Sequence, residues 1–145
     1  MKYQIILSSL VLGLAASAAD TNQVAQPAAD TAVIQRGKYL VERVAMCGEC
    51  HTPRDEQGHL DHAHWLQGNV LDYKPTNSRP FTPIAPPIAS LPSYATDDLA
   101  VRFLETGQTA NGKPAQPPMP QFRLTHDDAI AVVAYLRSLK LITDE

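Results

Sequence analysis

Two cysteines and a histidine make the most specific chemical pattern in the chain. Cys47 and Cys50 are its only cysteines, and they run straight into His51 in the sequence Cys-Gly-Glu-Cys-His. Two thiols with this spacing can lie on one side of a single turn, where they suit addition to the two vinyl groups of a haem. The imidazole that follows can bind the iron axially. The pattern therefore predicts one haem c, attached at Cys47 and Cys50 and ligated by His51.

Three other uses of a cysteine pair fit the sequence less well. A disulfide is usual for two cysteines in an oxidising compartment, but the adjoining histidine favours a haem. A thioredoxin-like redox pair belongs to a fold with strands around the motif, and no strand–helix–strand pattern surrounds Cys47. A structural zinc site needs four ligands, and the chain has no second cysteine pair.

A methionine can fill the sixth position of the iron. Met1 belongs to the N-terminal segment, and Met46 adjoins the attachment motif, so Met119 is the methionine able to reach the other face of the ring. Its loop is stiffened by four prolines, Pro114, Pro117, Pro118 and Pro120. Stiffening lowers the entropy lost when the loop is ordered. Ligation by His51 and Met119 is expected to raise the reduction potential, because a thioether favours Fe(II).

Four further histidines are rival ligands, namely His59, His62, His64 and His126. The first three share a polar loop without ordered spacing, and His126 opens the last predicted helix, so we expect all four on the surface. Trp65 is expected to cover the haem edge or a gap in the core rather than to relay electrons.

Helices separated by proline-rich loops have to position these residues. The proline-free segment from Val33 to Met46 carries an apolar stripe (Val33, Gly37, Leu40, Val41, Val44), which predicts a helix ending at the cysteine motif. A short helix is predicted after Tyr94, with Thr96 as its cap and Gly107 as its stop. It is expected to bury Leu99, Phe103 and Leu104.

The last helix is the clearest element. Thr125 is its predicted cap, and its buried stripe comprises Ala129, Val132, Val133, Leu136 and Leu139. Six prolines between Thr52 and Leu91 exclude a long helix there, and they argue against a strand in the run from Pro83 to Ile88. The predicted fold class is therefore all-α, with three or more helices around one haem.

The two ends of the chain indicate export. Residues 1–19 have a basic start, a short apolar run and small residues at the end, which predicts a cleaved signal peptide and a periplasmic protein. The apolar run is shorter than the roughly 20 residues that span a bilayer, although an uncleaved anchor remains an alternative. Residues 20–32 are expected to be a flexible linker, and residues 33–141 to form the domain. The net charge of −3 excludes a basic nucleic-acid surface.

From about Val33 to Leu139 the chain resembles the class I cytochrome c family. Beyond the cysteine motif, the segment 132–136 resembles the C-terminal helix of that family, whose aromatic residue packs on a glycine of the first helix, here Gly37. The segment 85–88 resembles the loop whose proline carbonyl accepts a proton from the haem histidine, and Pro86 is the matching position. About 34 residues separate His51 from Pro86, so an insertion lies there.

The resemblance extends to bacterial periplasmic cytochromes and to cytochrome domains of membrane dehydrogenases. It implies that arginines can pair with the haem propionates, and Arg54 and Arg79 are the candidates in this chain. It implies a monomeric electron carrier, not an enzyme, between a periplasmic dehydrogenase and a respiratory oxidase, touching the membrane only through partners or an uncleaved signal. Two alternatives stay open: a subunit of a periplasmic dehydrogenase complex, and an open-site haem protein for peroxide or a gas. The last requires Met119 to be unbound.

Overall fold

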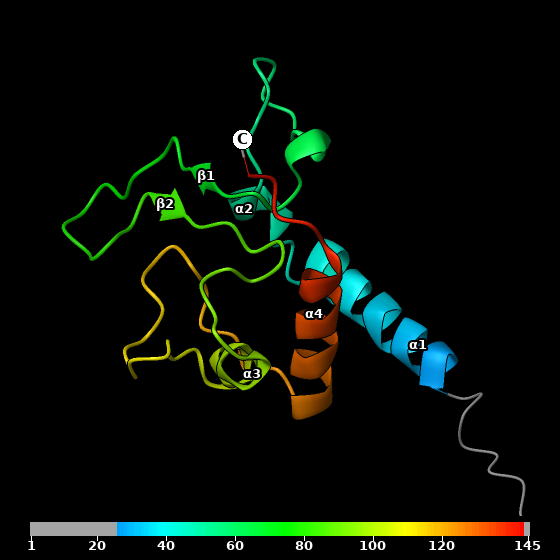
Figure 1. The fold of residues 1–145 in the computed structure, drawn as a ribbon. Coiled ribbons are helices and arrows are strands. Elements are labelled where there is room, and N and C mark those ends of the chain that lie inside the picture. The colour runs from blue at the N-terminus through cyan, green and yellow to red at the C-terminus, as the bar shows by residue number, and fades with distance from the viewer. Residues whose placement is uncertain (1–25, 144–145) are drawn as a thin grey trace, which may run out of the picture.

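The computed structural model describes residues 26–143, and the expected signal peptide lies outside them. Four α-helices are joined by long loops (Figure 1). In chain order the elements are α1 (Gln26–Tyr39), the π-helix η1 (Leu40–Val44), α2 (Gly48–His51), the 3-10 helix η2 (His62–His64), β1 (Asn69–Val70), β2 (Ile84–Ala85), α3 (Asp97–Thr106) and α4 (His126–Ser138). The predicted class is confirmed, because the fold is mostly helical. Among the helices of residues 26–143, none is long and apolar enough to cross a bilayer.

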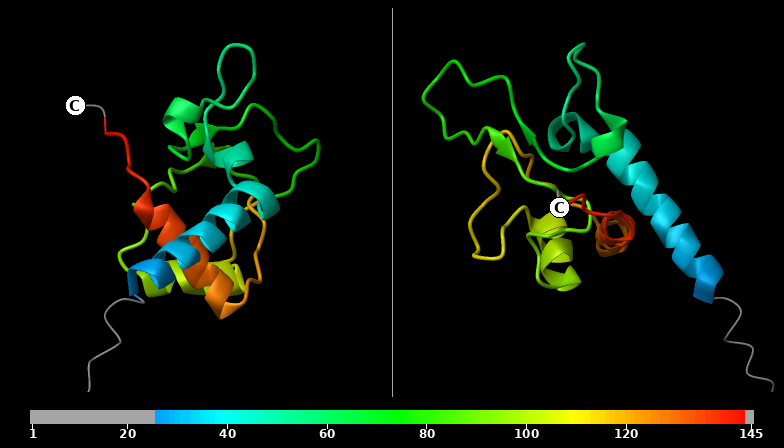
Figure 2. Two further views of the ribbon diagram at one scale, coloured as in Figure 1. Left: turned by 90° about the vertical axis from the view of Figure 1, so that its right-hand side faces the viewer. Right: turned by 45° about the horizontal axis from the view of Figure 1, so that its top comes forward.

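The crossing of α1 and α4 organises the core (Figure 2). At the crossing, a Cβ built on Gly37 would overlap the carbonyl of Ala131 and would lie 2.9 Å from the Cβ of Tyr135. Only glycine allows the two backbones to approach so closely. The predicted contact between Gly37 and the aromatic residue of the last helix is confirmed.

The first helix is longer than predicted. α1 begins at Gln26, so residues 26–32 of the expected linker are helical. Pro27 is compatible with this start, because a proline is tolerated in the first turn of a helix, where its missing N–H would be unpaired anyway. The buried stripe is also narrower than predicted. Gly37, Leu40 and Val41 are buried, whereas Val33 and Val44 are 36% and 53% exposed.

Gly107 and Thr125 cap α3 and α4 as the sequence predicts, whereas Thr96 occupies the N-cap position of α3 without a side-chain capping hydrogen bond. Gly107 ends α3 with a φ of 68°, and its N–H bonds to the carbonyl of Phe103 at 2.7 Å. Thr125 caps α4 by accepting a hydrogen bond from the N–H of Asp128 at 3.3 Å. The buried face of α3 differs from the prediction. Ala100 and Val101 are its buried residues, while Leu99, Phe103 and Leu104 are half-buried.

A small sheet corrects the expectation that prolines exclude strands. Asn69 pairs with Ala85 and Val70 with Ile84 in an antiparallel ribbon. The prolines at positions 83 and 86 flank the two-residue strand β2 instead of interrupting it. Pro83 also contributes its carbonyl, which accepts a hydrogen bond from the N–H of Leu71 at 2.7 Å. A proline can therefore extend the pairing as an acceptor although it cannot donate.

Candidate functional site

The single turn α2 sorts the cysteine motif into two faces. Cys47, Cys50 and His51 line one cavity, whereas Gly48 and Glu49 line a second pocket behind the turn. Residues three and four apart share a face of a helix, so the spacing of the motif produces this sorting. The turn is fixed to the preceding helix, because the N–H of Cys47 bonds to the carbonyl of Val41 at 3.0 Å.

All five residues predicted for the site line one cavity of about 570 Å³. These are Cys47, Cys50, His51, Pro86 and Met119. Most of the remaining wall is apolar and comes from α3, α4 and the loop before α4, with Phe103, Leu104, Phe122, Val132 and Leu136 among its residues. None of the described residues that line the cavity is Asp, Glu, Lys or Arg. The cavity is thus a largely apolar space with two thiols, an imidazole and two thioethers, those of Met46 and Met119, at its wall.

His51 is held in an orientation suited to metal binding. His51 is buried, with 5% of its surface exposed, and its Nδ1 lies 2.7 Å from the carbonyl oxygen of Pro86. A carbonyl can only accept, so Nδ1 carries the proton and Nε2 is the nitrogen available to iron. Burial lowers the pKa of His51, although the hydrogen bond to Pro86 opposes this shift. The neutral ring is the form that binds a metal.

No disulfide joins Cys47 and Cys50. Burial raises the pKa of Cys47 to about 11. Dithiol exchange depends on a thiolate with a lowered pKa, so this environment disfavours the thioredoxin-like alternative. No strand–helix–strand unit occurs among the described residues either.

The loop that carries Met119 is anchored at both ends to the end of α3. The N–H of Ala115 bonds to the carbonyl of Gly107 at 2.9 Å, and the N–H of Leu124 bonds to the carbonyl of Leu104 at 3.1 Å. Met119 itself closes a turn onto the carbonyl of Gln116 at 3.1 Å. The half-buried methionine is therefore presented to the cavity by a restrained segment.

The rival histidines lie elsewhere. His59, His62, His64 and His126 are all exposed, as predicted, and none of them lines the cavity. His64 and His126 pair with carboxylates, Asp61 at 2.6 Å and Glu105 at 2.8 Å. Among the described histidines and methionines, His51, Met46 and Met119 are the ones that line this cavity.

Sequence comparison assigns the chain to a family. Residues 34–140 match the family model described as Cytochrome c. The chain belongs to the cytochrome c family. The family implies a covalently attached haem c and a role in electron transfer, and the thiols, the oriented imidazole and the apolar walls fit that group.

Two relatives of this cytochrome are larger proteins. A protein named diheme cytochrome c-type from Cereibacter sphaeroides is 34% identical over 113 residues, which cover 74% of this chain and 36% of the relative. The fructose dehydrogenase cytochrome subunit of Gluconobacter japonicus is 33% identical over 118 residues, or 72% of this chain and 21% of the relative. The cytochrome thus spans about a third and about a fifth of their lengths.

Two arginines suggested for the propionates do not line the haem cavity of the cytochrome. Arg54 pairs with Glu49 at 2.8 Å and donates to the carbonyl of Gly58 at 2.9 Å. Arg79 is exposed in the loop between β1 and β2. The polar side chains at the cavity wall are neutral ones, among them Thr82, Tyr94, Thr109 and Asn111.

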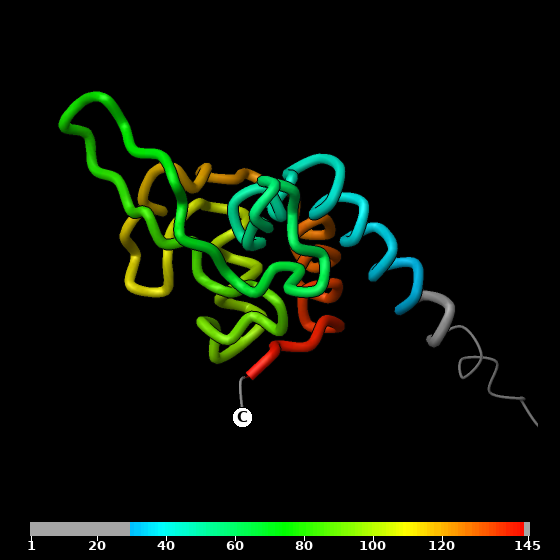
Figure 3. The backbone as a smooth tube through the Cα atoms, turned by 90° about the horizontal axis from the view of Figure 1, so that it is seen from above, coloured from blue at the N-terminus to red at the C-terminus, as the bar shows by residue number. Residues whose placement is uncertain are grey.

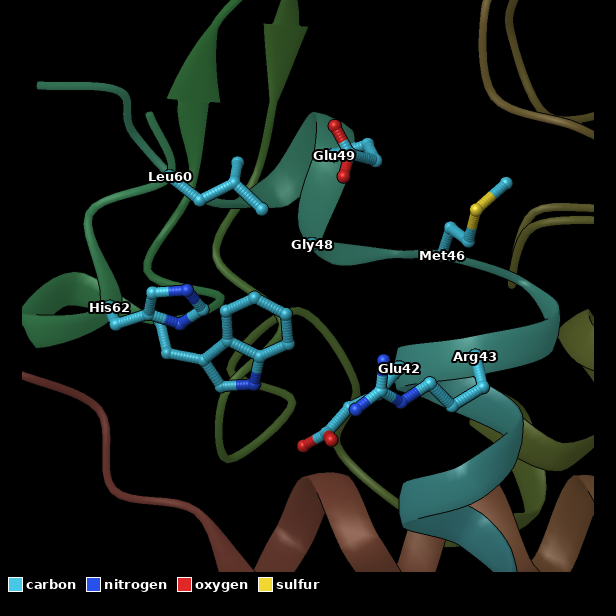
Figure 4. Close-up of a pocket in the computed structure, with 8 residues that line it drawn as sticks. Glu42, Arg43, Met46, Gly48, Glu49, Leu60 and His62 are labelled. Atoms are coloured by element: carbon cyan, nitrogen blue, oxygen red, sulfur yellow. The ribbon is translucent and has the colours of Figure 1, made fainter. Parts of the chain in front are cut away.

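Trp65 packs behind the attachment motif of the cytochrome, not at the cavity. A Cβ on Gly48 would overlap its indole ring, and His62 stacks on the other side with ring centroids 5.4 Å apart. Both aromatic residues line the second pocket, of about 470 Å³, which Figure 4 shows with Gly48 and Glu49 on its wall. Trp65 is half-buried and packs against the hydrophobic core, so the structure agrees more closely with the core role than with the haem-edge role.

Two residues whose hydrogen bonds stabilise the surroundings of the site, Thr52 and Arg137, were not predicted from the sequence. Thr52 is fully buried, and its hydroxyl accepts a hydrogen bond from the N–H of Leu66 at 3.0 Å. Arg137 donates to the carbonyls of Ser90 and Tyr94 at 2.7 and 3.1 Å, which ties the segment before α3 to α4. From the sequence alone, Arg137 could be placed only near the end of the last helix. That position does not show which loop its side chain will contact.

Proposed function

We propose that the protein is a periplasmic carrier that shuttles single electrons through one haem ligated by His51 and Met119. The observation that carries the proposal is that His51, Met119 and both cysteines line one cavity. The chain contains one Cys-Gly-Glu-Cys-His motif, so one haem is expected. The proposed donor is a periplasmic dehydrogenase, and the proposed acceptor is a respiratory oxidase.

The residues of the site perform three tasks. Cys47 and Cys50 supply the covalent attachment, and Pro86 fixes the tautomer and the direction of the His51 ring. Met119 would offer a neutral thioether from a loop that backbone hydrogen bonds restrain. A haem bound here supplies a one-electron Fe(III)/Fe(II) couple. With His51 and Met119 both holding the iron, the site would favour electron transfer over the binding of peroxide or a gas.

A second role is supported by the relatives. One of them is named as the cytochrome subunit of fructose dehydrogenase, so this chain could serve a dehydrogenase complex in the same way. The two roles differ in whether the chain remains bound to a larger protein. Size-exclusion chromatography of the native protein in periplasmic extract distinguishes a free carrier, which we expect as a monomer, from a subunit.

The decisive test replaces Met119. In Met119→Ala we expect the midpoint potential to fall by on the order of 0.1 V, within the roughly 0.8 V that axial ligands control. The reduced variant should bind carbon monoxide, and the oxidised variant should lose the weak near-infrared Fe–S band. Potentiometry and absorption spectra measure all three effects.

Met46→Ala is the matched control, because Met46 lines the same cavity but adjoins the attachment motif. This variant should keep the band and should exclude carbon monoxide. An unchanged potential in Met119→Ala, or a wild type without the near-infrared band, would remove Met119 as a ligand and favour the open-site alternative.

A further inference from the structure

The insertion between His51 and Pro86 contains a segment that contacts both sides of the cavity. We name residues 68–86 the brace. On the His51 side, the N–H of Gly68 bonds to the carbonyl of His51 at 2.8 Å. At its other end, the carbonyl of Pro86 lies 2.7 Å from Nδ1 of the same histidine. Both ends of the brace are thus hydrogen-bonded to His51.

Near its C-terminal end, the brace contacts the loop that carries Met119, the second predicted ligand. The N–H of Thr82 bonds to the carbonyl of Pro117 at 2.8 Å, two residues before Met119. Figure 3 shows this part of the brace next to the loop that precedes α4. Because Met119 closes a turn on Gln116, a restraint on Pro117 acts inside that turn.

The brace is built to transmit this restraint. Its two limbs are joined by the pairing of Val70 with Ile84 and by the edge contact of Tyr73 with Phe81, whose ring centroids are 5.9 Å apart. Leu71, on the inner side of the ribbon, is buried and lines the cavity. The limbs therefore cannot separate freely while the cavity wall is intact.

We propose that the insertion serves to position Met119, and that the backbone N–H of Thr82 is the positioning group. The inference rests on the proposed ligation by Met119. Through this one hydrogen bond, the segment that orients His51 also holds the methionine loop against the cavity. Its effect is to make displacement of Met119 by an added ligand less favourable.

The test compares two substitutions at one position in the haem-loaded protein. Thr82→Pro removes the donor N–H, whereas Thr82→Ala removes only the side chain. Imidazole is titrated into the oxidised protein, and loss of the near-infrared Fe–S band reports displacement of Met119. We expect apparent imidazole affinity to rise roughly three- to tenfold in Thr82→Pro, as loss of one hydrogen bond allows. Because Thr82→Ala also shortens a side chain at the cavity wall, it is the reference with which Thr82→Pro is compared.

A second variant guards against distortion by proline. Phe81→Ala loosens the contact between the limbs while it leaves the Thr82 N–H in place, and it should raise imidazole affinity in the same direction. If neither Thr82→Pro nor Phe81→Ala differs from Thr82→Ala, the brace does not position Met119, although the proposed function stands. A wild type that lacks the Fe–S band overturns the proposed function and this inference together.

Discussion

At the scale of single residues, a few side chains could support either thiol exchange or metal binding, and their surroundings decide which of the two is favoured. The cysteine pair could in principle exchange electrons itself, but burial raises the pKa of Cys47 to about 11 and keeps it protonated. The same burial keeps His51 neutral, with Nδ1 engaged by Pro86. One apolar environment thus suppresses thiol exchange and favours metal binding.

The attachment can be tested directly. Cys47→Ser combined with Cys50→Ser should yield protein without covalent haem, because a hydroxyl does not form the thioether link. Each single variant, as the control, should retain one link. Mass spectrometry of the denatured protein measures the attached haem, and a haem mass on the double variant would refute the motif.

The sequence identified most of the site because its chemistry is local. Cys47, Cys50 and His51 are neighbours in the chain, and Met119 followed from the small number of methionines. Thr52 and Arg137 could not be found in this way. Their partners, Leu66 and the backbone near Tyr94, lie far along the sequence, and backbone groups carry no sequence signal.

At the scale of elements, caps and close approaches were predictable, whereas lengths and short pairings were not. Thr125 precedes the first turn of α4 and Gly107 follows the last turn of α3 as expected, since capping depends on one residue type at one position. The start of α1 at Gln26 and the ribbon at β2 were missed, because prolines were treated only as breakers. In both places the proline lies where its N–H is not needed.

The crossing of α1 and α4 gives a prediction in which two effects oppose each other. Gly37→Ala raises helix propensity by about 1 kcal/mol, but its Cβ would overlap the Ala131 carbonyl. Overpacking of this kind costs about 1–3 kcal/mol, and a backbone neighbour cannot move aside as a side chain can. We therefore expect a net loss of unfolding free energy, measured by denaturant titration.

Gln35→Ala is the matched control, because Gln35 is exposed on the same helix. It should leave stability within about 0.5 kcal/mol of wild type. A Gly37→Ala variant as stable as this control would show that the two helices can separate without penalty.

At the scale of the whole molecule, the proposed haem count and export are tested together. We expect the 145-residue chain, expressed with its first 19 residues in a host that matures c-type cytochromes, to be recovered from the periplasm. Its intact mass should equal residues 20–145 plus a single haem. A mass that retains residues 1–19 would favour an uncleaved anchor, and recovery from the cytoplasm would contradict export.

The neutral lining of the cavity affects the reduction potential of a metal bound there. Ferric iron carries one more positive charge than ferrous iron, and that charge is stabilised less by apolar walls than by water or carboxylates. None of the described lining residues is Asp or Glu, so the surroundings favour the state with the smaller charge. A metal bound in this cavity would therefore be a stronger oxidant than the same metal surrounded by water or carboxylates.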